Sequence, residues 1–161
     1  MTGPPTNRSL RAIALSLALL TAACSADSAP TVSVTVGDQQ MDVEATQYCL
    51  DGEGKRYPVT PQVLQVEPEE TILIEVPDDV AESGWSFQVF EQGLQDDGLI
   101  GEVDVGQEAS YELSTSDAIP AAYYIVVVQN SGQDCEGLSG AWPIGFLRAA
   151  SYFDLKNGGS S

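Results

Sequence analysis

The sequence predicts an all-β fold, an antiparallel immunoglobulin-like β-sandwich of about seven to eight strands, preceded by a signal-peptide helix. After residue 31, short apolar runs alternate with period two and are bounded by Gly, Pro, Asp or Asn. No stretch after residue 24 repeats apolar residues at helical spacing over a useful length. Many short strands without helices favour packed antiparallel sheets over a parallel α/β sheet.

The amino-terminal residues have the zones of a secretory signal. A polar segment carrying Arg8 and Arg11 precedes an apolar run, residues 12–20 (AIALSLALL), and small residues then lead to Cys24. A helix of about nine residues rises roughly 14 Å, less than half of a hydrocarbon core of about 30 Å, so it is too short to span a membrane. We predict a lipoprotein signal peptide over residues 1–23.

Small residues ending in Cys24 resemble the bacterial lipobox, in which the thiol receives a diacylglyceryl group and becomes the first mature residue. The lipobox usually has Leu three positions before the cysteine, where this chain has Thr21. We predict lipidation of Cys24, followed by a flexible tether within residues 24–31. Acyl chains contribute roughly 0.8 kcal/mol per buried CH₂, so two or three of them anchor a protein stably. The alternative is cleavage after Ala26, which would release a secreted soluble domain.

The chain has three cysteines, an odd number for an exported protein. If Cys24 carries lipid, Cys49 and Cys135 remain as a pair in a compartment that permits disulfides. Closing their loop would stabilise the fold by roughly 4–5 kcal/mol in the chain-entropy model. A metal site at these two cysteines is the alternative, but the chain has no His and no CxxC spacing. We predict a disulfide and no metal.

The predicted sandwich spans residues 32–156 and is followed by a loose tail, residues 157–161. Residues 52–61 (GEGKRYPVTP) are turn-rich, and residues 80–83 could form one helical turn. The strand candidates are residues 32–36, 41–45, 62–66, 71–76, 85–90, 111–113, 122–129 and 142–147.

Burial is predicted from the same alternation. Residues 122–128 are apolar on both faces, which is typical of a central strand. Asp117 before Tyr123 and Tyr124 is similar to the Asp and tyrosine corner entering strand F of immunoglobulin-like domains. The predicted core residues are Ile72, Ile74, Val76, Trp85, Phe87 and Val89.

The charge balance limits the partners. Without the signal, 24 acidic residues oppose four basic ones (4 − 24 = −20), which are Lys55, Arg56, Arg148 and Lys156. Such a surface repels phosphate backbones and anionic headgroups, so we predict no nucleic-acid binding. It fits solubility, cation attraction or a basic partner.

No catalytic constellation or cofactor motif is present, and we predict that the protein is not an enzyme. Without His, only Lys55 in a Gly-rich loop and Lys156 in the tail could activate a Ser or Thr. The paired acids Asp78-Asp79 and Asp96-Asp97 lie in predicted turns, where solvated carboxylates are expected.

Binding of calcium or a small ligand remains the alternative. Residues 95–98 (QDDG), with Asp134 and Glu136, supply oxygen ligands but lack the alternating ladder of a calcium loop. Trp85 and Trp142 are single aromatic residues in strand candidates, which core packing or a ligand platform would explain.

Several short motifs carry a family resemblance: Tyr48-Cys49, Val66-x-Pro68, the Ile72-to-Trp85 stretch (IxIxVPxxVAxxxW) and Ala141-Trp142. From about Met41 to Leu147, the chain resembles small actinobacterial lipoproteins grouped as domain of unknown function 2771. The resemblance implies a cell-envelope lipoprotein and supplies no activity, cofactor or catalytic residue. We therefore expect a non-catalytic interaction or accessory module, held at the extracytoplasmic face of the cell membrane by its lipid, with an envelope protein as a possible partner.

Overall fold

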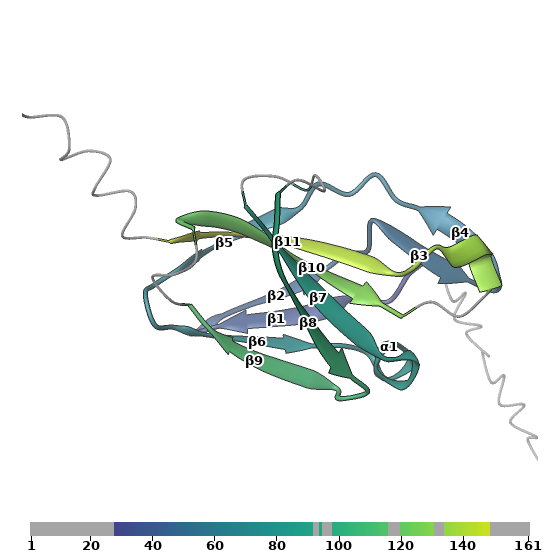
Figure 1. Ribbon diagram of the computed structural model, residues 1–161, viewed down its shortest axis with the longest axis horizontal. Coiled ribbons are helices and arrows are strands. Elements are labelled where there is room, and N and C mark those ends of the chain that lie inside the picture. Colours follow the sequence, from purple (N-terminus) through teal and green to yellow (C-terminus); the bar gives the residue numbers. More distant parts are fainter. Residues whose placement is uncertain (1–27, 92–93, 95–97, 116–119, 131–133, 149–161) are drawn as a thin grey trace, which may run out of the picture.

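The computed structural model describes residues 28–91, 94, 98–115, 120–130 and 134–148 (Figure 1). It confirms the all-β sandwich. The elements of the described chain are β1 Val32–Val36, β2 Gln39–Val43, β3 Gln47–Leu50, β4 Glu53–Arg56, β5 Gln62–Val66, β6 Thr71–Glu75, α1 Asp78–Ser83, β7 Trp85–Glu91, β8 Leu99–Gly106, β9 Ser110–Ser114, β10 Ala122–Gln129, the 3₁₀ helix η2 Asp134–Gly137, and β11 Ala141–Arg148.

The strands form two sheets that pack as layers (Figure 1). The first sheet has the order β2-β1-β6-β9, and the second has the order β4-β3-β11-β10-β7-β8 with β5 also paired to β11. Every pair is antiparallel except β5 and β11, which run parallel from Gln62 opposite Ile144 to Val66 opposite Arg148. The prediction of an antiparallel sandwich therefore holds for all but this one pair.

The described chain has eleven strands, more than the seven to eight predicted. The three additional strands are β3, β4 and β8. β4 is polar and mostly exposed, and it pairs only with β3. Because it lies within the turn-rich segment of residues 52–61, its sequence does not predict a strand. β8 is an edge strand whose pairing with β7 is broken twice by irregularities, and its apolar residues Leu99 and Ile100 are exposed. Neither strand has the burial that produces a clear period-two pattern.

The core lies between the inner faces of the two sheets. Val32, Val34 and Val36 of β1 are fully buried at alternate positions. Five of the six predicted core residues are buried, and Val89 is the exception. Val89 is only partly covered because it pairs with Gly101, which has no side chain.

β10 is the central strand that its apolar sequence predicted, since it pairs with β11 on one side and β7 on the other. Its inner residues Tyr123, Ile125 and Val127 are buried. The Tyr123 ring stacks on Phe146 of β11 at a centroid distance of 5.2 Å. Asp117, which the tyrosine-corner resemblance requires, lies outside the described residues.

Pro143 lies in the middle of β11 without breaking the sheet. The Thr46 N–H donates to the Ala141 carbonyl at 2.8 Å, so the outer edge of β11 faces β3 at that residue. By strand alternation the Pro143 nitrogen points to the same edge. On this edge β11 pairs with β3 only at Ala141 and with β5 from Ile144 onward. Pro143, which has no N–H to donate, therefore lies between the two pairings, where no backbone hydrogen bond is required.

The helix α1 follows Pro77 and is longer than the single predicted turn. Its residues Val80 and Ala81 are buried against the core, and it ends at Gly84, whose φ of 79° favours glycine. In the described part of the chain, no helix has the length and apolar character needed to cross a membrane.

β1 begins and β11 ends at opposite ends of the long axis (Figure 1). The end at which the described chain begins, with Ser28, also carries the β3–β4 hairpin, η2 and α1. We call it the tether end.

Candidate functional site

The tether end brings together the predicted cysteine pair. Cys49 on β3 and Cys135 on η2 form a disulfide with a Cα–Cα distance of 5.8 Å, which confirms the predicted bond. It joins an early strand to the loop after β10 and does not connect the two sheets. Cys24, the predicted lipidation site, lies outside the described residues.

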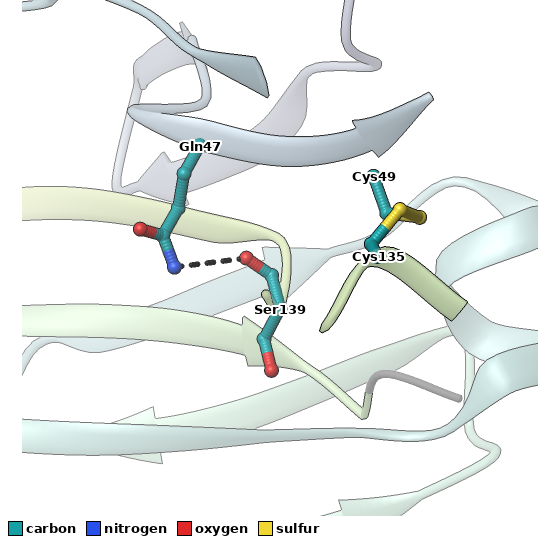
Figure 2. Close-up of a disulfide and its surroundings, with 4 residues drawn as sticks. All are labelled: Gln47, Cys49, Cys135 and Ser139. Atoms are coloured by element: carbon teal, nitrogen blue, oxygen red, sulfur yellow. Dashed lines mark hydrogen bonds between the residues drawn. A yellow bond between two sulfur atoms is a disulfide. The ribbon is translucent and has the colours of Figure 1, made fainter. Parts of the chain in front are cut away.

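Few other contacts attach β3 to the sheet. β3 pairs with β11 only where Gln47 opposes Ala141. The Gln47 Nε2 donates to the Ser139 carbonyl at 3.0 Å, close to the disulfide (Figure 2). The Thr46 hydroxyl adds a bond of 3.2 Å to the Ala141 carbonyl. The disulfide therefore reinforces a strand whose backbone pairing to the sheet is minimal.

Trp142 connects the incoming chain to the core. Its side chain is fully buried, and its indole N–H donates to the Pro30 carbonyl at 2.8 Å. The Tyr48 ring packs edge-on against it, with 5.9 Å between centroids. Trp85, also fully buried, donates to the Glu108 carbonyl at 2.7 Å. Both tryptophans pack in the core, and each indole N–H binds a loop carbonyl.

A polar network lies beside Trp142. The Tyr48 hydroxyl donates to Asp79 Oδ2 at 2.6 Å, which links β3 to α1. Gln129 Nε2 donates to the Ser83 hydroxyl at 3.1 Å, and that hydroxyl donates to the Asp79 carbonyl at 2.8 Å. The network therefore connects β3, α1 and β10.

Tyr48 is held in its neutral form. Burial, followed by the hydrogen bond to Asp79 and its charge, raises the pKa of Tyr48 to about 12, while a hydrogen bond with Gln129 acts in the opposite direction. A phenol that keeps its proton throughout the physiological range is a hydrogen-bond donor. The arrangement therefore suits positioning of α1 and does not prepare Tyr48 as a base or a nucleophile.

Gly140 allows this packing. A Cβ at residue 140 would lie 2.6 Å from Trp142 Cη2 and 2.9 Å from Gln129 Oε1. Real Cβ atoms do not approach other atoms so closely, so the residue before β11 must be glycine for Trp142 and Gln129 to keep these positions.

The acidic residues do not form a described metal centre. In the described ranges, no three His, Cys, Asp or Glu residues gather as metal ligands. Asp96 and Asp97 lie outside these ranges, and only the backbone of Asp134 and Glu136, on η2, is described. Asp78 and Asp79, predicted as solvated turn acids, are exposed in the first turn of α1.

Sequence reasoning missed the partners at this end. The sequence predicts Asp79, like Asp78, to be a solvated turn acid, whereas its bond to Tyr48 spans 31 residues without any local signal. The Pro30 carbonyl is a backbone group, so no residue type in the sequence marks it as the acceptor of the Trp142 indole N–H. The one available signal is Tyr48 itself, a Tyr beside a disulfide Cys on a strand, where a buried hydroxyl needs a partner.

Fold and site together define a class, an all-β sandwich domain whose disulfide attaches a strand to an inter-strand loop. The chain belongs to the protein family of unknown function DUF2771, whose model matches residues 25–131. The match includes the Ile72-to-Trp85 stretch and excludes Cys135, Ala141 and Trp142, so it ends earlier than the expected resemblance. The curated proteins and the solved structures give no match to this chain.

Proposed function

We propose that this chain is an exported envelope lipoprotein, anchored through Cys24, whose domain is a non-catalytic interaction module. The observation that carries the proposal is the hydrogen bond from Trp142 to the Pro30 carbonyl. It joins the chain to the buried core only six residues after the predicted lipid attachment site. The resemblance to actinobacterial lipoproteins supports the same proposal.

A tether of this length restricts the height of the domain above a membrane. Six residues span at most about 20 Å when fully extended, at roughly 3.3–3.6 Å each. The tether end would therefore face the lipid surface, and the end at which β11 finishes would point away from it. Lys55 and Arg56, half of the mature basic charge, lie on β4 at the tether end. The strongly acidic remainder would be repelled by anionic headgroups.

The chemistry of the tether end supports a binding role. Its polar groups hydrogen-bond to one another, and Tyr48 keeps its proton. Specificity would then come from the surfaces and sheet edges of a rigid sandwich. Calcium or small-ligand binding remains the alternative, and no observation on the described residues favours it.

Expression of the full chain in an actinobacterial host, followed by membrane fractionation and intact mass measurement, tests the anchor. We expect a membrane-bound product that begins at Cys24 and carries the mass of two or three acyl chains. The Cys24→Ser variant should be recovered without lipid and outside the membrane fraction. An unmodified wild-type product that begins at Asp27 would overturn the proposal of anchoring.

A further inference from the structure

An apolar stripe crosses the outer face of the larger sheet. Five residues lie opposite one another on five neighbouring strands, on the face away from the core. In strand order they are Val63, Gly145, Tyr124, Phe90 and Leu99. Leu147 lies beside the stripe, two residues after Gly145. Val63 is 57% exposed and Leu99 is 43% exposed, whereas Phe90 is only 8% exposed, so the stripe presents large apolar side chains to solvent at its two ends.

A groove opens in the stripe at Gly145. It has a volume of about 100 Å³, and its lining includes Val63, Tyr124, Gly145 and Leu147. A Cβ at residue 145 would lie 2.9 Å from Val63 Cγ2 and 3.1 Å from Tyr124 Cε1. The side chains of Val63 and Tyr124 therefore close over the backbone at Gly145, and the groove that they line together with Leu147 can take one small aliphatic group.

The β7–β8 end of the stripe is acidic. Glu102 is the next outward-facing residue of β8 after the irregularity that follows Leu99. Asp104 continues the same face of β8, and both carboxylates are exposed. Among the described residues, the basic side chains lie elsewhere. Lys55 and Arg56 are on β4 at the tether end, and Arg148 continues the inward-facing positions of β11.

We propose that this stripe is a docking surface for a basic, aliphatic segment of another envelope protein. Aliphatic anchors would fill the groove at Gly145 and cover Val63 and Leu99, while Lys or Arg side chains would pair with Glu102 and Asp104. Charge decides among the possible occupants. A second copy of this acidic chain would place like charges against each other, and a nucleic acid or an anionic lipid would be repelled.

The surface is also accessible from outside the membrane. The stripe crosses β11 near its carboxyl end, away from the tether end. The inference rests on the proposed interaction role, but it does not need the lipid. It can therefore be tested on the mature chain carrying Cys24→Ser with its disulfide formed, and its failure would leave the anchoring test unaffected.

Three seven-residue peptides serve as probes: one alternating Lys and Leu, one alternating Glu and Leu, and one alternating Lys and Ser. Amide chemical shifts measured during titration report both affinity and location. We expect only the Lys–Leu peptide to shift the amide signals of Val63, Tyr124 and Leu99. Its affinity should fall as salt rises, because its charged contacts lie at an exposed rim.

Substitutions show whether peptide affinity depends on the stripe itself or on general attraction to an acidic protein. Val63→Ser and Leu99→Ser should each weaken binding of the Lys–Leu peptide about fivefold or more, since they remove apolar anchors. Glu102→Gln should weaken it about twofold to threefold and flatten its salt dependence. Leu73→Ser and Glu112→Gln are matched controls, because these two residues face each other on the outer surface of the smaller sheet. Neither control should change the affinity.

Four results would overturn the proposal. The Lys–Leu peptide could bind the stripe variants as tightly as the wild type, or the Glu–Leu peptide could bind equally well. Stripe signals that broaden with protein concentration in the absence of peptide would show that a second copy occupies the face. Stripe signals that shift when residues 149–161 are deleted would show that the chain's own carboxyl-terminal segment covers it.

Discussion

The indole N–H of Trp142 and the carbonyl of Pro30 meet at 2.8 Å, although 112 residues separate them in sequence. Trp142 is fully buried in the last strand, and Pro30 lies two residues before the first. This hydrogen bond thus joins the segment before the first strand to the last strand at the tether end. A displacement of the chain at Pro30 would therefore act directly on a core side chain.

Trp142→Phe should loosen this closure. The variant keeps an aromatic ring but removes the donor to the partly buried Pro30 carbonyl, and an unpaired buried polar group costs about 1–3 kcal/mol. We expect a loss of roughly 2–3 kcal/mol in the free energy of unfolding, measured in urea, and faster proteolysis before Val32. Trp85→Phe is the matched control, since it removes the bond to Glu108. It should destabilise the fold to a similar extent without accelerating cleavage before Val32.

Removal of the disulfide should release the β3–β4 hairpin first. Cys49→Ser with Cys135→Ser opens a loop of 86 residues, and loss of a native disulfide costs about 2–5 kcal/mol. Hydrogen exchange should accelerate most in β3 and β4, because β3 pairs with β11 at a single position. Exchange in β10 should follow only the global loss of stability. Equal acceleration in β10 and β3 would contradict the idea of a locally attached hairpin.

The raised pKa of Tyr48 predicts how the stability of the fold changes at high pH. Its pKa is about 12 in the folded state, above the ordinary value of 10, so folding favours the protonated phenol. Its contribution to stability is fully present below pH 10 and is lost as the pH rises through about 12. Tyr48→Phe should lower stability by about 1.5–3 kcal/mol at neutral pH, where the bond to Asp79 is lost.

The same variant should weaken the dependence of stability on pH between 10 and 12, measured by urea unfolding at each pH. Tyr123 is the comparison, because burial also raises its pKa to about 12 although no hydrogen bond to its hydroxyl is present in the described structure. Absorbance of tyrosinate should lose one late-titrating group in Tyr48→Phe. An unchanged late titration in that variant would show that Tyr48 does not hold its proton as described.

Local sequence patterns were enough to predict some strands with their bounds. Residues 32–36 became β1 as predicted, because apolar side chains alternate there. Residues 62–66 became β5 as predicted, because a short run with β-branched residues lies between Pro61 and Pro68. The Cys49–Cys135 bond followed from counting cysteines, which requires no three-dimensional information. These features are encoded within a few residues or in the composition.

Relations across the sandwich could not be read in this way. The parallel pairing of β5 with β11 depends on which edge β3 leaves free, and no local pattern carries that choice. The stripe from Val63 to Leu99 becomes visible only when five strands are placed in register. Tyr48 and Asp79 likewise meet only because α1 closes the end of the sandwich. The site is therefore a product of the topology more than of any motif.

Gly140→Ala provides a test of packing at the tether end. The added Cβ would lie 2.6 Å from Trp142 Cη2 and 2.8 Å from its Cζ3, so the buried indole would have to move. Overpacking of this kind costs about 1–3 kcal/mol, and a displaced indole would also weaken its bond to Pro30. Thermal or urea unfolding should therefore show a clear loss of stability, with a shift in tryptophan fluorescence of the folded protein.

Gly101→Ala is the matched control, because no atom lies within 4 Å of its added Cβ. That variant should be neutral or slightly stabilising, since alanine reduces the freedom of the unfolded chain. Equal stability of the two variants would show that Trp142 can shift at no cost.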